Sequence, residues 1–477
     1  MSITTLHSLL ARHEHQAVVR RLSPARSDRE LELLAHALRK LGEDDEAARL
    51  IEARLATGLA SHPRSLRLLA RIRCARKDYD GACALFRLAL QARPEQSWYR
   101  LAMGDVYRFH ADEPERALAI YRAALPAPAQ LRGDKEQTDR YLLRRISHIL
   151  DELDRPEEAI AAFEAFLRLA PAKFYESDWA RLGRCYERIG QLDRALALWL
   201  QGTTKRRGTK CLRELERAAP ELAATVLLPE APKAPPEALR IPVKTRLLTE
   251  EDEAPKVIAE AVAGVARAGD VLTFASAPAA ITEGRAVSAE CIDAGLLARF
   301  LKRYVKKPAY NPHQSDAPLA SAVSFQLAIE LAGAPRIVAA AAAGAAGKLV
   351  GQKGWFYTVA GDTIRMIDGL CGALAPYDFC VTPGPYDADC LAELICEATG
   401  HQAAIVDAHD LGLAWVVGAS AGVDRAQVAS FMVDNPAGNE DNQTPIILLR
   451  DAGAAAGSEA GLPGSPSIRK REGIPKG

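Results

Sequence analysis

The sequence predicts an α-helical solenoid followed by an α/β domain. Across residues 1–228, apolar and small side chains recur with a period of about 34 residues, which is typical of stacked helix pairs. From residue 241 onward, short apolar runs alternate with longer helical stretches, and this alternation predicts an α/β (α+β) domain. Four prolines between residues 229 and 236 separate the two patterns, so we expect an interdomain linker over residues 229–240.

Composition sets the first limits on function. The 477 residues include 61 basic and 61 acidic side chains, so the chain lacks the basic excess with which nucleic-acid-binding proteins release counterions. The start of the chain shows no export signal, and the longest uncharged apolar stretch, residues 337–347, is far shorter than the roughly 20 residues that cross a bilayer. Nine scattered cysteines show no zinc-ligand spacing. We therefore expect a cytoplasmic protein with no nucleic-acid or membrane partner.

The clearest repeat unit spans residues 179–199. One expected helix carries a glycine that permits close approach of a second helix and a tyrosine that fills the space beside it, and the second helix has an alanine at the crossing point. These positions, with a leucine and two tryptophans, are Trp179, Leu182, Gly183, Tyr186, Ala195 and Trp199. The pattern resembles a tetratricopeptide repeat (TPR), and the resemblance implies a solenoid that docks a protein partner.

Earlier copies with similar spacing bring the total to about five units. The copy around Gly104 and Tyr121 has one extra residue in its turn. Residues 205–228 have an apolar side that is typical of a helix closing a solenoid. The repeat positions in the earlier copies include Leu31, Leu34, Ala47, Ile51, Leu66, Leu69, Ala82, Phe86, Gly104, Tyr107, Ala117, Tyr121, Ala159 and Phe163.

The second half predicts an α/β domain over residues 241–452. Residues 254–268 and 388–399 have helical periodicity. Residues 453–477 are rich in glycine, alanine, serine and proline, and we expect them to form a disordered tail. Short apolar runs predict strands at residues 271–275, 403–406, 415–417 and 446–449.

Two catalytic motifs are incomplete in this domain. Residues 342–349 contain Gly-Lys but have alanine and leucine where a phosphate-binding loop needs a glycine and a hydroxyl. Residues 418–422 spell a nucleophile elbow around Ser420, yet all ten histidines precede that serine, whereas α/β-hydrolases place the catalytic histidine after it. The sequence therefore favours neither a phosphate-binding loop of this type nor a serine hydrolase.

Acidic residues at strand ends and turns are the candidates for chemistry. Asp407 directly follows a buried apolar run, where an anion is costly unless a metal or hydrogen bonds compensate. Asp368 precedes a glycine, and Asp410 lies just beyond Asp407. Each of these aspartates is also a suitable turn or helix-capping residue, so the residues alone leave both interpretations open.

Five ordered blocks stand out over about residues 241–451: residues 269–276 (GDVLTFAS), 282–287 (TEGRAV), 368–369 (DG), 382–387 (TPGPYD) and 405–407 (IVD). They resemble the sequential blocks of the coenzyme F-420-0:L-glutamate ligase family. A ligase-like branch of the family is similar in further blocks, which lie at residues 347–351, 353–357, 360–362, 434–438 and 443–445.

The resemblance implies a nucleotide- and metal-dependent ligase. That family joins the acid side chain of a deazaflavin cofactor to the amine of L-glutamate, with GTP and a divalent metal, in a homodimeric α/β fold. By position, Asp368 and Asp407 match the acids that hold Mg²⁺ or Mn²⁺, and GTP or ATP is the implied co-substrate. The implied nucleotide- or substrate-binding residues are Glu283, Gly284 and Arg285, together with Lys348, Lys353 and Arg365 as clamps on phosphate or carboxylate.

Two departures from the family pattern leave alternatives open. Ala277 stands where the family commonly has a lysine, and Ala408-His409-Asp410 replaces a hydroxyl residue and a Gly-Arg pair. Either His409 and Asp410 bind a different substrate, or the nucleotide site has been lost and the domain only binds a ligand or partner. The sequence thus supports two functions: an amide (γ-glutamyl-type) ligase with a protein-docking solenoid, or a non-catalytic adaptor.

Overall fold

A computed structural model describes most of the chain. The expected linker residues 229–237 and the expected tail, residues 453–477, lie outside the described residues. The described residues are 6, 9–25, 27–56, 62–94, 96–132, 138–204, 209–226, 238–305, 319–352, 354–370, 374–409, 413–438 and 442–451.

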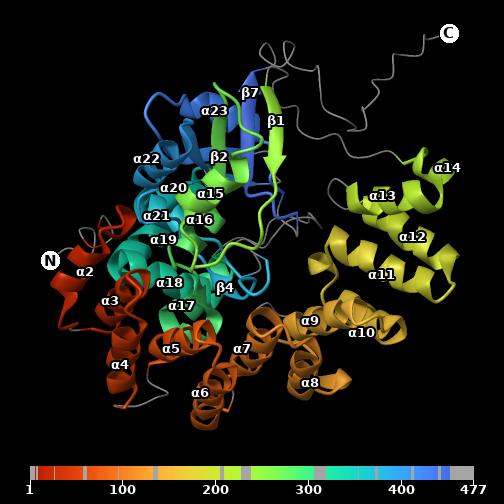
Figure 1. Cartoon of the computed structure of the whole chain (residues 1–477), viewed down its shortest axis with the longest axis horizontal. Helices are drawn as coiled ribbons and strands as arrows, with labels where there is room; N and C mark the ends of the chain where they lie inside the picture. The colour runs from red at the N-terminus through yellow and green to blue at the C-terminus, as the bar shows by residue number, and fades with distance from the viewer. Residues whose placement is uncertain are drawn as a thin grey trace.

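The N-terminal half is an arc of helix pairs (Figure 1). Helix α2 (His15–Leu22) precedes the pairs, and α13 (Thr209–Ala218) and α14 (Pro220–Ala223) follow them. The expected closing helix is therefore two helices, because Pro220 cannot continue α13 and instead begins α14. The pairs are α3 (Asp28–Lys40) with α4 (Asp44–Leu55), α5 (Pro63–Ala75) with α6 (Tyr79–Ala92), α7 (Trp98–Asp105) with α8 (Pro114–Ala124), α9 (Asp139–Glu152) with α10 (Pro156–Leu169), and α11 (Glu176–Arg188) with α12 (Leu192–Thr203).

Glycines bring the two helices of a pair together as the sequence predicts. A Cβ on Gly183 would lie 2.1 Å from Nε1 of Trp199, so only glycine allows α11 and α12 to pack this closely. The same indole nitrogen donates a hydrogen bond to the carbonyl of Ala180 at 3.1 Å. In the third pair a Cβ on Gly104 would lie 2.0 Å from the Tyr121 ring.

The extra residue in the third repeat has a structural counterpart. Residues Val106–His110 form a π-helical turn at the end of α7. A π turn holds one more residue than an α turn, so it accommodates an insertion without breaking the helix. The Tyr107 side chain at this turn stays buried and donates a hydrogen bond to Asp80 at 2.6 Å.

The C-terminal half contains a five-stranded sheet in the order β1-β7-β2-β5-β6. Only β2 and β5 are parallel, and the other neighbours are antiparallel. The expected strands at residues 271, 403, 415 and 446 all form, and β1 begins three residues before the expected start of the domain at 241. The strands are β1 (Ala238–Val243), β2 (Val271–Ala275), β5 (Ala403–His409), β6 (Leu413–Ala419) and β7 (Ile446–Asp451).

Helices cover both faces of this sheet. Helices α15 (Ala254–Val262) and α22 (Ala388–Thr399) share one apolar core with β2, β5 and β7. Helix α23 (Arg425–Met432) packs on the other face against residues such as Ile447. Helix α15 is shorter than the expected 254–268, and it ends just before Gly264, a residue type that disfavours helix.

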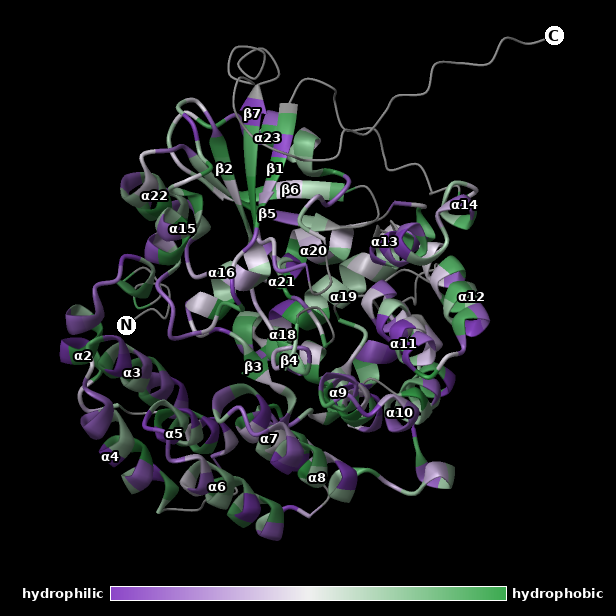
Figure 2. Cartoon of the chain, turned by 45° about the vertical axis from the view of Figure 1, so that its right-hand side comes forward, coloured by the Kyte–Doolittle hydropathy of each residue, from purple (hydrophilic) through white to green (hydrophobic). Residues whose placement is uncertain are grey.

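A helical layer lies between the sheet and the solenoid (Figure 2). The layer contains α16 (Ser276–Thr282), α17 (Leu296–Leu301), α18 (Ala322–Ala332), α19 (Ala334–Leu349), α20 (Trp355–Ala360), α21 (Asp362–Arg365) and the ribbon of β3 (Val287–Ser288) with β4 (Cys380–Val381).

Among the described residues, no single helix has the length and apolar character of a membrane span. Helices α18 and α19 meet those criteria only when joined, and they are bent by 116° relative to each other.

One hydrophobic core is shared by the solenoid and this layer. Trp98 of α7 stacks on Phe379, with ring centroids 5.7 Å apart, and both side chains are buried. The first helix of each early pair faces the C-terminal domain, and the second helix lies on the outer side of the arc (Figure 2). The two halves therefore pack as a continuous unit.

Candidate functional site

Asp407 lies at the carboxyl end of the parallel strands. In β5 it pairs with Trp415 of β6, and the preceding residue, Val406, lies opposite Ala275 at the end of β2. Helix α16 begins at the next residue, Ser276. The carboxyl ends of parallel strands are where α/β sheets most often place ligands.

Asp368 reaches the same place from another part of the chain. It follows α21 and forms an isolated bridge with Thr382, in which the two backbone N–H groups donate to the opposite carbonyls at 2.7 and 2.9 Å. Burial raises the pKa of Asp368 well above its usual value, and repulsion from the Asp407 carboxylate raises it further. The two acids that the resemblance selected are thus electrostatic neighbours in the fold.

Residues 382–387, which pair with Asp368 through Thr382, also contact the Glu283–Arg285 turn. The Glu283 carboxylate accepts a hydrogen bond from the backbone N–H of Tyr386 at 2.5 Å. Arg285 donates to the carbonyl of Gly384, and its guanidinium lies 4.4 Å from the centroid of the Tyr386 ring. Residues 382–387 therefore connect this turn to the Asp368 bridge.

Burial changes the charge of Glu283. Burial raises the pKa of this carboxyl to about 7, although Arg285 and the Tyr386 N–H both oppose the shift. Near neutral pH the group is therefore divided between its neutral and ionised forms. A carboxyl with such a pKa can exchange a proton with a bound ligand at physiological pH.

Gly284 places the turn against the solenoid. Its φ of +70° is in the left-handed region, and a Cβ at this position would lie 2.9 Å from the His36 ring on α3. Burial lowers the pKa of His36 well below its usual value, so the ring is neutral. A glycine here is required both by the backbone conformation and by the close approach of α3.

The remaining candidates from the sequence lie elsewhere. Lys348 is exposed at the end of α19 and donates to the carbonyl of Tyr304 at 3.3 Å. Arg365 is exposed and pairs with Asp362 at 3.5 Å. His409 ends β5 by its backbone, and Lys353 and Asp410 lie outside the described residues, as does the His409 side chain.

The solenoid presents basic residues to the C-terminal domain that are not among the candidates predicted from the sequence. Arg64, Arg67 and Arg71 lie on one face of α5, and their spacing of three and four residues was the available signal. Each of the three forms an ion pair with a glutamate of the C-terminal half. The pairs across the junction are Arg39–Glu251 (2.7 Å), Arg67–Glu290 (2.7 Å), Arg93–Asp293 (2.9 Å), Arg145–Asp378 (2.6 Å), Arg64–Glu330 and Arg71–Glu250.

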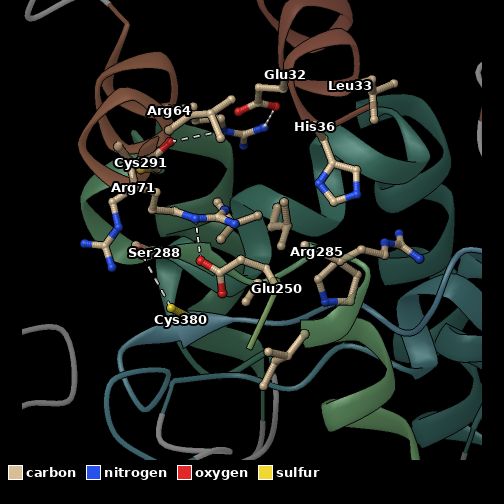
Figure 3. Close-up of a pocket in the computed structure, with 18 of the residues that line it drawn as sticks. Glu32, Leu33, His36, Arg64, Arg71, Glu250, Arg285, Ser288, Cys291 and Cys380 are labelled. Atoms are coloured by element: carbon tan, nitrogen blue, oxygen red, sulfur yellow. Dashed lines mark hydrogen bonds and ion pairs between the residues drawn. The ribbon is translucent and has the colours of Figure 1, made fainter. Parts of the chain in front are cut away.

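A cavity of about 160 Å³ lies at this junction (Figure 3). Side chains of α3 and α5 form one wall, and the Glu283–Arg285 turn, α18 and β4 contribute to the opposite wall. The Arg71 guanidinium faces Glu250, and Tyr377 also donates a hydrogen bond to that carboxylate. Burial opposes ionisation of Glu250, yet Arg71 and Tyr377 lower its pKa to about 2.

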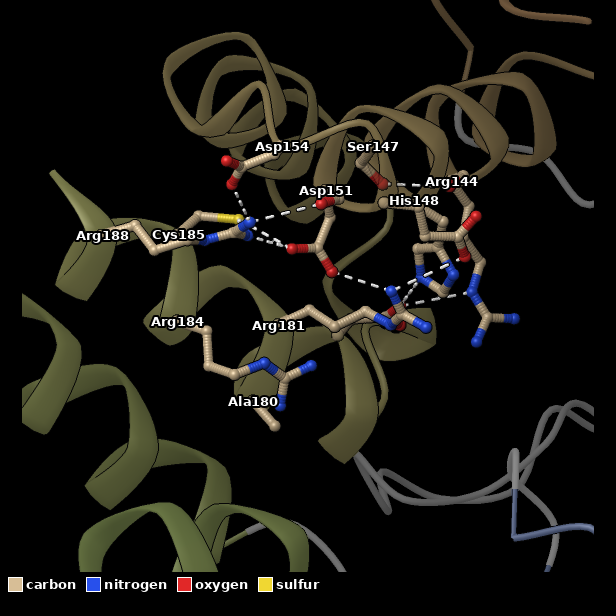
Figure 4. Close-up of polar contacts among 12 residues, drawn as sticks. Arg144, Ser147, His148, Asp151, Asp154, Ala180, Arg181, Arg184, Cys185 and Arg188 are labelled. Atoms are coloured by element: carbon tan, nitrogen blue, oxygen red, sulfur yellow. Dashed lines mark hydrogen bonds and ion pairs between the residues drawn. The ribbon is translucent and has the colours of Figure 1, made fainter. Parts of the chain in front are cut away.

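Beyond the junction, α9 and α11 are joined by a polar network (Figure 4). Asp178 contacts Nε2 of His148 at 2.6 Å and Nε of Arg144 at 3.4 Å. Burial opposes ionisation of Asp178, yet Arg144 and His148 lower its pKa to about 2. Arg181 donates to Asp151 at 2.8 Å. These ion pairs hold the fourth and fifth helix pairs together.

Comparison with known proteins supports the repeat assignment. Models of the tetratricopeptide repeat match residues 30–61 and 145–173. No curated protein matches the chain.

Solved structures similar to the chain include a double mutant of MamA from RS-1, which is 19% identical and covers 40% of this chain and 94% of its own, with a TM-score of 0.29. TTC0263, a TPR protein of Thermus thermophilus, is 18% identical over 42% of this chain and 96% of its own, with a TM-score of 0.24. YrrB, described as a TPR protein with an unusual peptide-binding site, is 16% identical over 44% of this chain and 97% of its own, with a TM-score of 0.28. The two model matches and the five helix pairs identify the N-terminal half as tetratricopeptide repeats, a protein-interaction region.

Proposed function

We propose that the C-terminal half is a nucleotide- and metal-dependent ligase that forms an amide, γ-glutamyl-type bond on a small acidic substrate. The convergence of Asp368 and Asp407 carries this proposal. Burial and, after it, repulsion from the Asp407 carboxylate raise the pKa of Asp368, so keeping both groups ionised here is costly. A bound divalent cation would remove the cost by neutralising both carboxylates.

The donor set suits Mg²⁺ or Mn²⁺. These cations prefer oxygen ligands, and Mg²⁺ is commonly bound by one or two carboxylates, with water and substrate phosphates completing its shell. Asp368 and Asp407 supply two such carboxylates. The described residues contain no group of three or more histidine, cysteine or acidic side chains that could hold a metal. The site therefore fits a metal that is shared with a bound nucleotide better than a closed structural site.

The chain's own groups support such a reaction in two ways. A free carboxylate is a poor acylating agent, so a ligase activates it with GTP or ATP. Asp368 and Asp407 would hold a cation, which would supply charge neutralisation to the phosphates. Glu283, with its pKa of about 7, is a suitable acceptor for the proton that an incoming amine must lose.

Metal binding gives a direct test. Calorimetric titration of the full chain with Mn²⁺ should show one saturable site that Asp407→Asn abolishes. The matched control is Asp362→Asn, because Asp362 is an exposed aspartate on α21 and its loss leaves the pair intact. Release of phosphate from GTP or ATP in the presence of glutamate and candidate acids should also be abolished by Asp407→Asn and retained by Asp362→Asn. Absence of Mn²⁺ binding in the wild-type chain would overturn the proposal.

A non-catalytic adaptor is the second candidate. Lys348 and Arg365, which the family resemblance assigned to phosphate or carboxylate, contact Tyr304 and Asp362 on the surface instead. A domain that lacks these clamps can retain a ligand without turning it over. Nucleotide binding without phosphate release, unaffected by Asp368→Asn, would favour the adaptor over the ligase.

A further inference from the structure

Two arginines that line the junction cavity differ from the other arginines there in their ion pairing. Arg64, Arg67 and Arg71 each face a glutamate within ion-pair distance. Arg29 and Arg285 line the same cavity, and within the described part of the chain neither forms an ion pair. Neither guanidinium thus has a carboxylate of the described residues within ion-pair distance, although Glu283 attracts Arg285 and Glu32 attracts Arg29 at longer range.

Arg285 is the more deeply buried of the two. It is 8% exposed, and its described polar contacts are the carbonyl of Gly384 and the face of the Tyr386 ring. Burial lowers the pKa of Arg285, although Tyr386 and Glu283 oppose the shift, and repulsion from Arg29 adds to it. A buried guanidinium is stable when an anion compensates it. Here a carbonyl and an aromatic face contact Arg285, and Glu283 attracts it without forming an ion pair.

The rest of the cavity wall defines the ligand further. His36 is neutral and can donate one N–H group, while Leu33, Leu68 and Leu327 supply apolar surface. The volume of about 160 Å³ is close to that of cavities that hold a benzene-sized molecule. The space therefore suits a small anion with a short organic body.

We propose that this cavity binds a small organic dianion, a phosphate monoester or a dicarboxylate, between the guanidinium groups of Arg29 on the solenoid and Arg285 on the C-terminal domain. Guanidinium forks recognise both kinds of head group by paired hydrogen bonds. Because one arginine comes from each half, the tetratricopeptide region forms part of a ligand site in addition to its protein-interaction role. This proposal is independent of the metal site at Asp368 and Asp407.

Titration of the full chain with phenyl phosphate and with malonate tests the proposal. At least one of them should bind at a single site, and the tighter of the two identifies the head group. Arg29→Gln and Arg285→Gln should each weaken binding about tenfold or more, as expected when a charged hydrogen-bond partner is lost. Arg29 is only half-buried, so its variant should fold even if the Arg285 variant does not.

Two controls separate this site from its neighbours. Arg93→Gln removes another arginine of the junction, paired with Asp293 and away from the cavity lining, and should leave the affinity within about twofold. Asp407→Asn should leave anion binding unchanged whatever it does to metal binding. No binding of either anion, or binding that Arg29→Gln does not weaken, would overturn the proposal.

Discussion

Arg145 of the solenoid forms a two-pronged ion pair with Asp378 of the C-terminal domain, at 2.8 Å from Nη1 to Oδ2 and 2.6 Å from Nη2 to Oδ1. The same guanidinium donates to Asp105 on α7 at 3.0 Å. All three side chains are 5% exposed or less. One arginine therefore satisfies a buried acid in each half of the chain, and it links the repeats to the domain that packs against them.

Replacing Arg145 should destabilise the whole chain. Arg145→Met leaves Asp105 and Asp378 buried without their shared cation, which should cost about 3–5 kcal/mol in the free energy of unfolding. Urea unfolding followed by circular dichroism measures the loss. Arg116→Gln is the control, because its pair with Asp80 is largely exposed and should contribute far less to stability. Equal effects of the two variants would contradict this account of the junction.

The stacked pair of Trp98 and Phe379 predicts that the two halves unfold together. Phe379→Ala removes a fully buried ring from the shared core and should cost about 3–5 kcal/mol. Hydrogen exchange should then speed up in both α7 and β4. Phe300→Ala, at a ring that is 51% exposed, should change stability by less than about 1 kcal/mol. Faster exchange confined to β4 would show that the halves are independent.

The elevated pKa of Asp368 predicts how stability depends on pH. An acid with a higher pKa in the folded than in the unfolded protein binds more protons when folded, so its contribution to stability falls as pH rises above its unfolded pKa. Asp368→Asn should therefore raise the melting temperature at neutral pH. Mn²⁺ should raise the melting temperature of the wild type but not of this variant. The exposed control, Asp362→Asn, should show neither effect.

The raised pKa of Glu283 predicts a second pH dependence of stability, in a defined pH range. Its pKa rises from 4.5 to about 7 on folding, so the stability it contributes is greatest below pH 4.5 and is lost as pH increases toward 7. The loss is at most about 3 kcal/mol. Glu283→Gln should therefore flatten the curve of unfolding free energy between pH 4.5 and about 7. Glu260→Gln, at an exposed position on α15, should leave the slope unchanged.

Local patterns in the sequence predicted the helix pairs of the repeats and four strands of the sheet. The repeat spacing predicts the five helix pairs, because a glycine such as Gly183 is needed where the two helices of a pair cross closely. Helix α22 spans residues 388–399 as expected, since Asp387 caps its start by accepting from the N–H of Cys390 at 3.1 Å. The apolar runs of the sheet are equally local signals, and they form strands where the sequence places them.

Contacts between distant segments required the folded chain. Asp368 and Asp407 belong to separate elements, and their mutual repulsion follows from how the Thr382 bridge and β5 are placed. Periodicity shows that Arg64, Arg67 and Arg71 share a face of α5, but it does not show what that face meets. Electrostatic interactions and packing depend on distance in space. The distances between segments that are far apart in the sequence are set only by the packing of the repeats against the C-terminal domain.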